Sequence, residues 1–281
     1  MESLLLIILL VLALPLAAML VWRWRDKRAD KAVWRQLEAL QVENPPIFDA
    51  SMLDGLPDPA RRYFLYTIRP GTRLYTVCRF SMHGKFGLGS KKSPNYIPMR
   101  AEQTLACPRG FIWKLKAGRG LLRITGSDAA IGTHSWSRFW LAGIVPVARA
   151  GGNSDHALSA FGRYVAEAVF WSPAALLPGR GVVWEAVDEA TARVTVSHEG
   201  RTQSADLEVD ARGRPVKVRF LRWSDANPEK TYRFQPFGGY LSEFREFGGF
   251  NLPTQIEAGN FFETEDYFAF FLAEVDDISF P

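Results

Sequence analysis

The sequence predicts a mainly β protein in which a large, curved antiparallel sheet, a partial barrel, encloses one inserted apolar helix behind an N-terminal transmembrane helix. Three observations predict it: an uncharged apolar run from Leu4 to Trp22, a period-two alternation that starts near Arg73, and one long segment of helical periodicity at residues 155–170. Alternating strands with one apolar face are typical of antiparallel sheets. A single continuous sheet of this size is expected to curl.

The N-terminal run is predicted to be a membrane anchor. Leu4–Trp22 is interrupted only by Pro15, and as a helix it is about 28 Å long, close to the ~30 Å hydrocarbon core. A cleaved signal peptide is the alternative, but the chain begins Met-Glu-Ser, without the basic residues of a signal peptide, and arginines follow the run. Because the bases follow the span, we expect a single-pass protein of the cell inner membrane, with its body on the cytoplasmic side and membrane lipids as partners.

The positive charge of the 281-residue chain is local. Its formal net charge is +4, and residues 23–35 carry six bases against Asp26 and Asp30. With Glu2 as the one charge before residue 23, residues 36–281 have a net charge of +1. A nucleic-acid-binding domain needs a basic face on its folded body, so we expect no nucleic-acid partner. The sequence does not indicate a protein partner.

The chain divides into three parts: residues 1–22 are the anchor, 23–56 a basic juxtamembrane stalk, and 57–281 one β domain. Within the stalk, residues 29–44 place Val33, Leu37 and Leu40 on one helical face. A second short helix is expected at residues 57–67. About ten strands are expected, some of the following ranges merging or failing: 74–87, 98–107, 110–117, 120–126, 130–137, 182–188, 191–198, 202–210, 215–223, 230–236, 239–247, 253–262 and 267–280.

The segment at 155–170 is predicted to be a helix on the concave face of the sheet. Asn153 and Ser154 can cap it, and Pro173 ends it. Its apolar stripe includes Phe161 and Val165. A helix inserted halfway through a series of antiparallel strands has to pack on the sheet, as a plug or a lid.

Several motifs of the chain resemble those of an uncharacterised bacterial family of membrane-anchored proteins, known as a domain of unknown function. The most specific is the run from Arg163 through Glu167, Trp171 and Pro173 to Pro178, and Gly249–Thr254 is also similar. The resemblance covers most of residues 57–280 and implies a single fold unit. It implies no catalytic residue, because none is established for the family. By fold-level analogy the architecture is similar to the half-barrels of bacterial lipoprotein carriers.

No metal or cofactor motif is found. The four histidines are far apart, and the chain has no CxxC, HExxH, GxSxG, P-loop or GxGxxG motif. Cys78 and Cys107 lie on predicted strands and are read as buried free thiols rather than a disulfide. We therefore expect no bound metal and no cofactor.

The predicted helix holds the one concentration of reactive groups. Arg163 and Glu167 are spaced i, i+4, with Tyr164 beside them. One interpretation makes Glu167 a general acid or base in an apolar pocket, with Arg163 as an anion clamp and Tyr164 as its partner, in a hydrolase or isomerase. The other is a structural ion pair between helix and sheet. The second is favoured, because no nucleophile or second carboxylate accompanies Glu167 in sequence.

The aromatic residues, 13% of the chain, predict the preferred function. One helix cannot cover the apolar face of so large a sheet, so an apolar cavity is expected, and such cavities bind ligands. We therefore predict a non-enzymatic, membrane-anchored domain that binds a lipid or another lipophilic molecule. Two alternatives remain: an enzyme that uses Glu167, and a structural or partner-binding scaffold of the membrane. The candidate ligand-binding residues are Phe161, Val165, Ala168, Trp171, Trp113 and Trp184.

Overall fold

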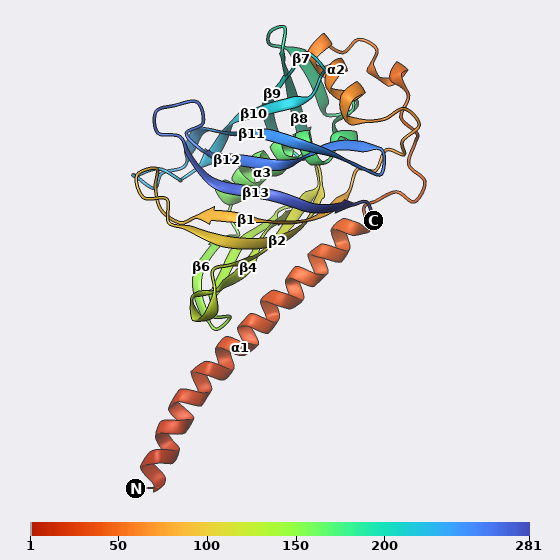
Figure 1. Ribbon diagram of the computed structural model, residues 1–281. Coiled ribbons are helices and arrows are strands. Elements are labelled where there is room, and N and C mark those ends of the chain that lie inside the picture. The colour runs from red at the N-terminus through yellow and green to blue at the C-terminus, as the bar shows by residue number, and fades with distance from the viewer. Residues whose placement is uncertain (1) are drawn as a thin grey trace.

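A computed structural model of the chain describes the backbone of residues 2–281 and the side chains of residues 13–281. Within this range thirteen strands form one antiparallel sheet (Figure 1). The strands are β1 (Cys78–Gly87), β2 (Tyr96–Ala106), β3 (Gly110–Ala117), β4 (Ile124–Ile131), β5 (His134–Leu141), β6 (Val145–Gly151), β7 (Val182–Ala186), β8 (Thr191–His198), β9 (Arg201–Val209), β10 (Pro215–Ser224), β11 (Arg233–Phe247), β12 (Phe250–Asn260) and β13 (Phe268–Ser279).

The strand order explains how one helix comes to lie inside the sheet. The order is β6-β5-β4-β3-β2-β1-β13-β12-β11-β10-β9-β8-β7, so two series of sequential strands meet where β1 pairs with β13. The chain leaves the first series at one edge, β6, and enters the second at the opposite edge, β7. Helix α3 (Ser154–Trp171) makes that connection across the concave face. The predicted curved antiparallel sheet with one inserted helix is confirmed.

Helix α3 forms where its sequence signals placed it. The side chain of Asn153 accepts a hydrogen bond from the backbone N–H of His156 and caps the helix, and Asp155 lies in the first turn. Both are favourable at the positive end of the helix dipole. The helix contacts β9 and β10, and also β3, β4, β5, β6 and β12. At Gly162 the helix lies so close to β9 that an added Cβ would be 2.7 Å from Gln203 Oε1.

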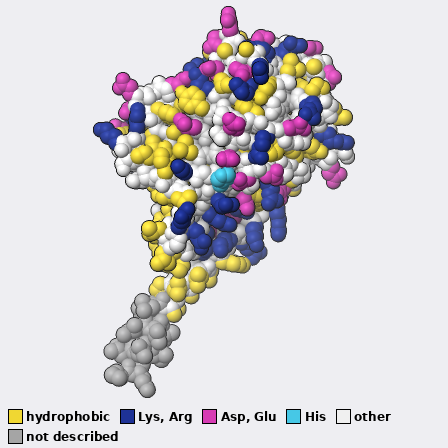
Figure 2. Space-filling view, viewed as in Figure 1, with side chains coloured by type: hydrophobic (Ala, Val, Ile, Leu, Met, Phe, Trp, Pro, Cys, Tyr) yellow, Lys and Arg dark blue, Asp and Glu magenta, His cyan; other side chains and the backbone are white. Residues whose placement is uncertain are grey.

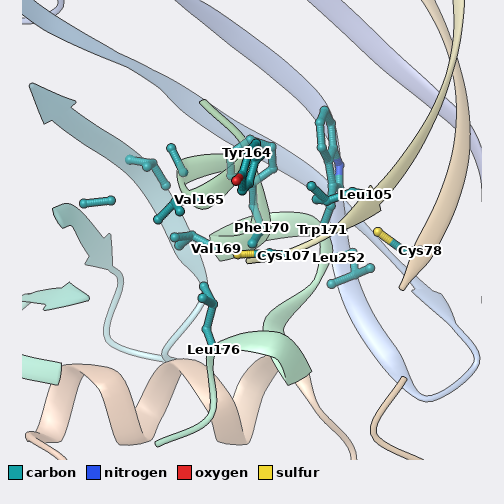
Figure 3. Close-up of a cluster of buried hydrophobic side chains, with 14 of the residues drawn as sticks. Cys78, Leu105, Cys107, Tyr164, Val165, Val169, Phe170, Trp171, Leu176 and Leu252 are labelled. Atoms are coloured by element: carbon teal, nitrogen blue, oxygen red, sulfur yellow. The ribbon is translucent and has the colours of Figure 1, made fainter. Parts of the chain in front are cut away.

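The main core lies between α3, the short helix α2 (Asp58–Thr67) and the concave face of the sheet. Val165, Val169 and Leu176 are fully buried there (Figure 3). The Tyr63 hydroxyl of α2 donates a 2.5 Å hydrogen bond to the carbonyl of Val169. Cys78 and Cys107 are buried free thiols, and burial raises the pKa of each.

Helix α1 (Glu2–Glu38) joins the predicted anchor and the predicted stalk helix in one continuous element, which projects from the body at its N-terminal end (Figure 1). Its C-terminal half packs on the outer face of the sheet, where Val33, Trp34 and Leu37 form a second core with Ile112 and Trp136. Residues 23–38 are therefore part of the folded body, whereas we had expected a stalk. The apolar face predicted from Val33, Leu37 and Leu40 is the face that contacts the sheet.

The structure describes the side chains of only part of the predicted membrane span. The side chains of residues 4–12 lie outside the described range. Among the described residues, no helix combines the length and the apolar character of a membrane span. Leu14, Leu20 and Trp22 of α1 are exposed.

Candidate functional site

A cavity of about 220 Å³ lies between α3 and the central strands of the sheet. It exists because α3 lies against β9 and β10 and leaves part of the concave face uncovered. For comparison, an apolar cavity of ~150 Å³ is enough to bind benzene. Its lining consists of Phe86, Trp113, Asp128, Phe139, Arg163, Ala166, Glu167, Phe170, Trp171, Val218, Phe220, Arg222, Phe237, Gly238, Gly239, Leu241, Ile256, Ala258, Phe270 and Phe271.

Nine of the twenty lining residues are aromatic. The ring centroid of Trp113 is 6.1 Å from that of Phe86 and 6.3 Å from that of Phe271. The ring centroids of Phe270 and Phe237 are 6.0 Å apart. Phe86, Phe237, Phe270 and Phe271 are only partly buried. An aromatic, partly open wall of this kind suits an apolar ligand.

One side of the cavity is polar and is organised by Arg163 of α3. Its guanidinium forms ion pairs with Asp128 of β4 and, at 2.7 Å, with Glu167 one helical turn away. The second oxygen of Glu167 accepts a 2.5 Å hydrogen bond from Gln103 Nε2. Burial by itself would lower the pKa of Arg163, but the two carboxylates outweigh burial and hold the pKa above its ordinary value. Arg163 therefore remains charged and compensated.

A second arginine on the same wall has no direct ion pair. Among the described residues, Arg222 of β10 has no carboxylate within 4 Å and no side-chain hydrogen bond, and its guanidinium lies 5.2 Å from the ring centre of Phe237. Burial, with the charge of Arg163 nearby, lowers the pKa of Arg222 to about 10. The group is still a cation at neutral pH.

The structure separates the six predicted ligand-binding residues into two groups. Trp113 and Trp171 line the cavity. The other four lie in the packed core instead: Phe161, Val165, Ala168 and Trp184. The three helix residues among them are fully buried on one face of α3. The ring centroids of Trp184 and Phe64 are 5.4 Å apart, and the Trp184 indole N–H donates a hydrogen bond to the Leu176 carbonyl. The stripe that sequence periodicity identified is the packed face, and the cavity lies beside it.

The weak catalytic candidates do not converge. Arg163 and Glu167 border the cavity, but both oxygens of Glu167 already accept hydrogen bonds. Tyr164 is buried away from the lining, where its hydroxyl is 3.3 Å from the Pro108 carbonyl and burial raises its pKa. The arrangement is that of an ion-pair network between helix and sheet, which was the favoured interpretation. Within the part of the chain that the structure describes, no group of three or more potential metal ligands occurs.

Sequence reasoning missed Asp128 and Arg222. A usable signal existed for Arg222, because Val216, Val218 and Phe220 alternate on the apolar face of the predicted strand and Arg222 continues that face. An arginine at a position that the alternation assigns to the interior is unusual and often functional. Asp128 had no such signal, because it falls between the predicted strands 120–126 and 130–137, where alternation assigns no face.

Comparisons with known proteins give a family and distant structural likenesses. A search of curated protein sequences gives no match. The LolA superfamily protein NE2245 from Nitrosomonas europaea is similar at 12% identity and TM-score 0.42, covering 79% of this chain and 92% of its own. A putative outer membrane lipoprotein-sorting protein domain from Vibrio parahaemolyticus is similar at 10% identity and TM-score 0.41, covering 73% and 85%. The family's sequence profile matches residues 46–272, so the chain belongs to a family of unknown function, DUF6544.

Proposed function

We propose that this protein is a membrane-anchored, non-enzymatic domain that binds a lipid or another lipophilic molecule. The observation that carries the proposal is the cavity of about 220 Å³, in which aromatic and aliphatic side chains form most of the wall. Water gains little against the apolar part of this wall, because a water molecule needs two to four polar partners. An apolar guest gains contact with the rings of Trp113, Phe237 and Phe270 and loses contact with water.

The test is lipid analysis of the purified full chain. The protein is extracted from membranes, and native mass spectrometry and organic extraction are used to measure the lipophile bound per chain. Ala258→Trp puts an indole into the cavity from β12, where Ala258 is partly buried. We expect about one bound molecule per wild-type chain and an affinity about tenfold or more lower in the variant.

Ala186→Trp is the matched control. It makes the same substitution at an exposed position of β7, outside the cavity lining, and it should leave the bound lipophile unchanged. If Ala258→Trp does not fold, Ala258→Leu is the smaller substitution. A wild-type protein that carries no lipophile would contradict the proposal and favour the scaffold alternative.

We propose, further, that α1 anchors the protein in the inner membrane with the body in the cytoplasm. The contacts of Trp22 with Trp140, and of Arg23 with Thr125, hold α1 against β4 and β5. Beyond these contacts two chain connections carry exposed apolar residues: Leu121 and Leu122 between β3 and β4, at 84% and 74% exposure, and Ile144 and Val145 where β5 leads into β6. Two such connections beside the exposed apolar part of α1 suit the interfacial layer of a bilayer.

Basic residues lie next to this apolar end. The groove between α1 and the sheet contains six bases and three acids, and Figure 2 shows Lys and Arg gathered where α1 reaches the body. Such a cluster is attracted to anionic headgroups. The groove is lined by the bases Arg23, Lys27, Lys31, Arg100, Lys114 and Lys116 and by the acids Asp30, Glu102 and Asp276.

Two measurements test the membrane proposal. The full chain should remain with membranes through a carbonate wash, and protease added to spheroplasts should leave the body intact. Recovery of the protein in the carbonate supernatant would refute the anchor. Digestion of the body from outside would refute the cytoplasmic orientation and leave the anchor in place.

A further inference from the structure

Three buried N–H groups on residues that line the cavity have no hydrogen-bond partner among the described residues: Nε1 of Trp113, Nε1 of Trp171 and Nε of Arg222. They come from three different elements, β3, α3 and β10. Most buried polar atoms in proteins have a partner, so three unpaired groups around one cavity require an explanation.

The unpaired groups of the lining are all donors. Of the two carboxylates in the lining, Glu167 accepts hydrogen bonds from Arg163 and Gln103, and Asp128 accepts them from Arg163 and, at 2.8 Å, from Ser137. The acceptors of the lining are therefore used by the protein itself, and the donors are not. A ligand that complements this wall must bring acceptor atoms, which in a lipophile are the oxygens of its head group.

The charges of the wall show the same asymmetry. Arg163 is balanced by two carboxylates, and its pKa is raised. Arg222 has no ion pair, and its burial and the nearby Arg163 lower its pKa although the charges of Asp128 and Glu167 partly oppose this. Arg222 is partly buried, a cation in that position without a direct partner is costly, and a ligand anion would relieve that cost.

We propose that the cavity takes an amphiphile with an anionic, oxygen-bearing head, a carboxylate or a phosphate, which binds Arg222 while its chain lies against the aromatic wall. This assignment rests on the proposed lipophile-binding function and specifies the chemistry of the ligand. The indole N–H groups of Trp113 and Trp171 supply further donors to oxygens of the ligand. The guanidinium suits either head, because its planar fork matches both carboxylate and phosphate.

The test compares probes that share one chain and differ in the head. Octanoate, octyl phosphate and octanol are titrated separately into the full chain, and native mass spectrometry measures the binding of each. The eight-carbon chain is chosen by comparison with benzene, a six-carbon molecule that binds in an apolar cavity of ~150 Å³. The cavity here is somewhat larger, at about 220 Å³. We expect octanoate or octyl phosphate to bind about tenfold more tightly than octanol. The tighter of the two identifies the head.

Arg222→Met tests the role of the arginine. It keeps an unbranched side chain and removes the charge, so the preference for the anionic probes should disappear while octanol binding persists. Arg219→Met is the matched control, because Arg219 lies on the same strand but pairs with Asp206 and Glu263 outside the cavity lining. That variant should keep the preference. If Arg222→Met does not fold, Arg222→Lys keeps the charge and should retain a reduced preference.

The outcomes separate the two proposals. Equal affinity of the wild type for octanol and both anions, or an unchanged preference in Arg222→Met, would overturn the head-group assignment while the apolar cavity still binds its guest. Failure of all three probes to bind would overturn the lipophile-binding function itself. In that case ordered water is the partner of the three donors.

Discussion

Helices α3 and α1 pack on opposite faces of the same sheet by different means. α3 is held on the concave face by a broad apolar surface that includes Phe161, Val165 and Val169, all fully buried. The buried part of α1 is a narrow seam of Val33, Trp34 and Leu37 together with two acids, Asp26 and Asp30. The hydrophobic effect scales with buried area, so α3 is an integral part of the core. α1 depends on specific polar contacts as well.

The largest effect is expected from breaking the apolar contact of α3. Phe161→Ala should lower the free energy of unfolding by about 3–5 kcal/mol, because it removes a fully buried ring from a packed interface. Urea denaturation of the full chain measures it. Phe234→Ala, at an exposed position of β11, is the control and should change stability by less than about 0.5 kcal/mol. A cost below about 1 kcal/mol for Phe161→Ala would show that this face of α3 does not hold the helix.

The next effect concerns the polar side of α3. Arg163→Met removes the partner of both Asp128 and Glu167 and should cost about 3 kcal/mol, since it leaves two mostly buried carboxylates without a cation. Adding Glu167→Gln and Asp128→Asn in the same chain should recover part of that loss. If the triple variant is no more stable than Arg163→Met, the cost comes from lost packing of the arginine rather than from unpaired charge.

A smaller effect is expected on α1. Asp26 accepts hydrogen bonds from Trp140 and, at 2.7 Å, from Arg149. Asp26→Asn keeps the shape and loses the charge, and it should weaken docking of α1 by about 1–2 kcal/mol. Faster hydrogen exchange at residues 23–38, with unchanged exchange in α3, is the expected result. Equal acceleration in both helices would mean that α1 does not undock independently of the core.

The pH dependence of Asp26 follows from its environment. Burial by itself would raise its pKa, but the hydrogen bonds of Arg149 and Trp140 and the charges of Arg149 and Arg138 outweigh burial, and the pKa is below its ordinary value. Its contribution to docking is therefore complete above the pKa of the unfolded chain, about 3.9, and is lost as the pH falls through the lower, folded pKa. Docking by Asp26 should not change between pH 6 and pH 8.

The smallest effect is expected one helical turn further, at Asp30. Burial raises its pKa, and the hydrogen bond from Ser127 only partly opposes this. Its charged form is therefore disfavoured in the folded protein, so stability decreases as the pH rises from the unfolded pKa through the raised one. Asp30→Asn should be neutral or stabilising by up to about 1 kcal/mol at pH 7. A clear loss of stability would show that Lys114 and Ser127 need the carboxylate charge.

The outer parts of the fold show where sequence patterns fail. Strand β6 was not predicted, because Val145 and Val147 lie at an exposed sheet edge and do not alternate with buried residues. Strand β11 was predicted as two strands because Gly238-Gly239 resembles a turn. In the structure the strand continues through both glycines, and a Cβ on Gly239 would be 2.1 Å from the Glu257 carbonyl oxygen. Gly239 therefore allows close packing with β12, and Gly238, where a Cβ would be 2.5 Å from the Val218 carbonyl oxygen, allows close packing with β10.

The sequence by itself determined the antiparallel strands, the capped helix at 155–170 and the buried thiols, because alternation, capping residues and burial are local properties of the chain. Only the tertiary structure decided which side of α3 is filled and which borders the cavity. That choice depends on how far the helix lies toward β9 and β10, and therefore on contacts between residues distant in sequence, such as Gly162 with Gln203. The acids of α1 are a second case. In sequence they belong to a basic cluster, and only packing against β4 and β5 buries them.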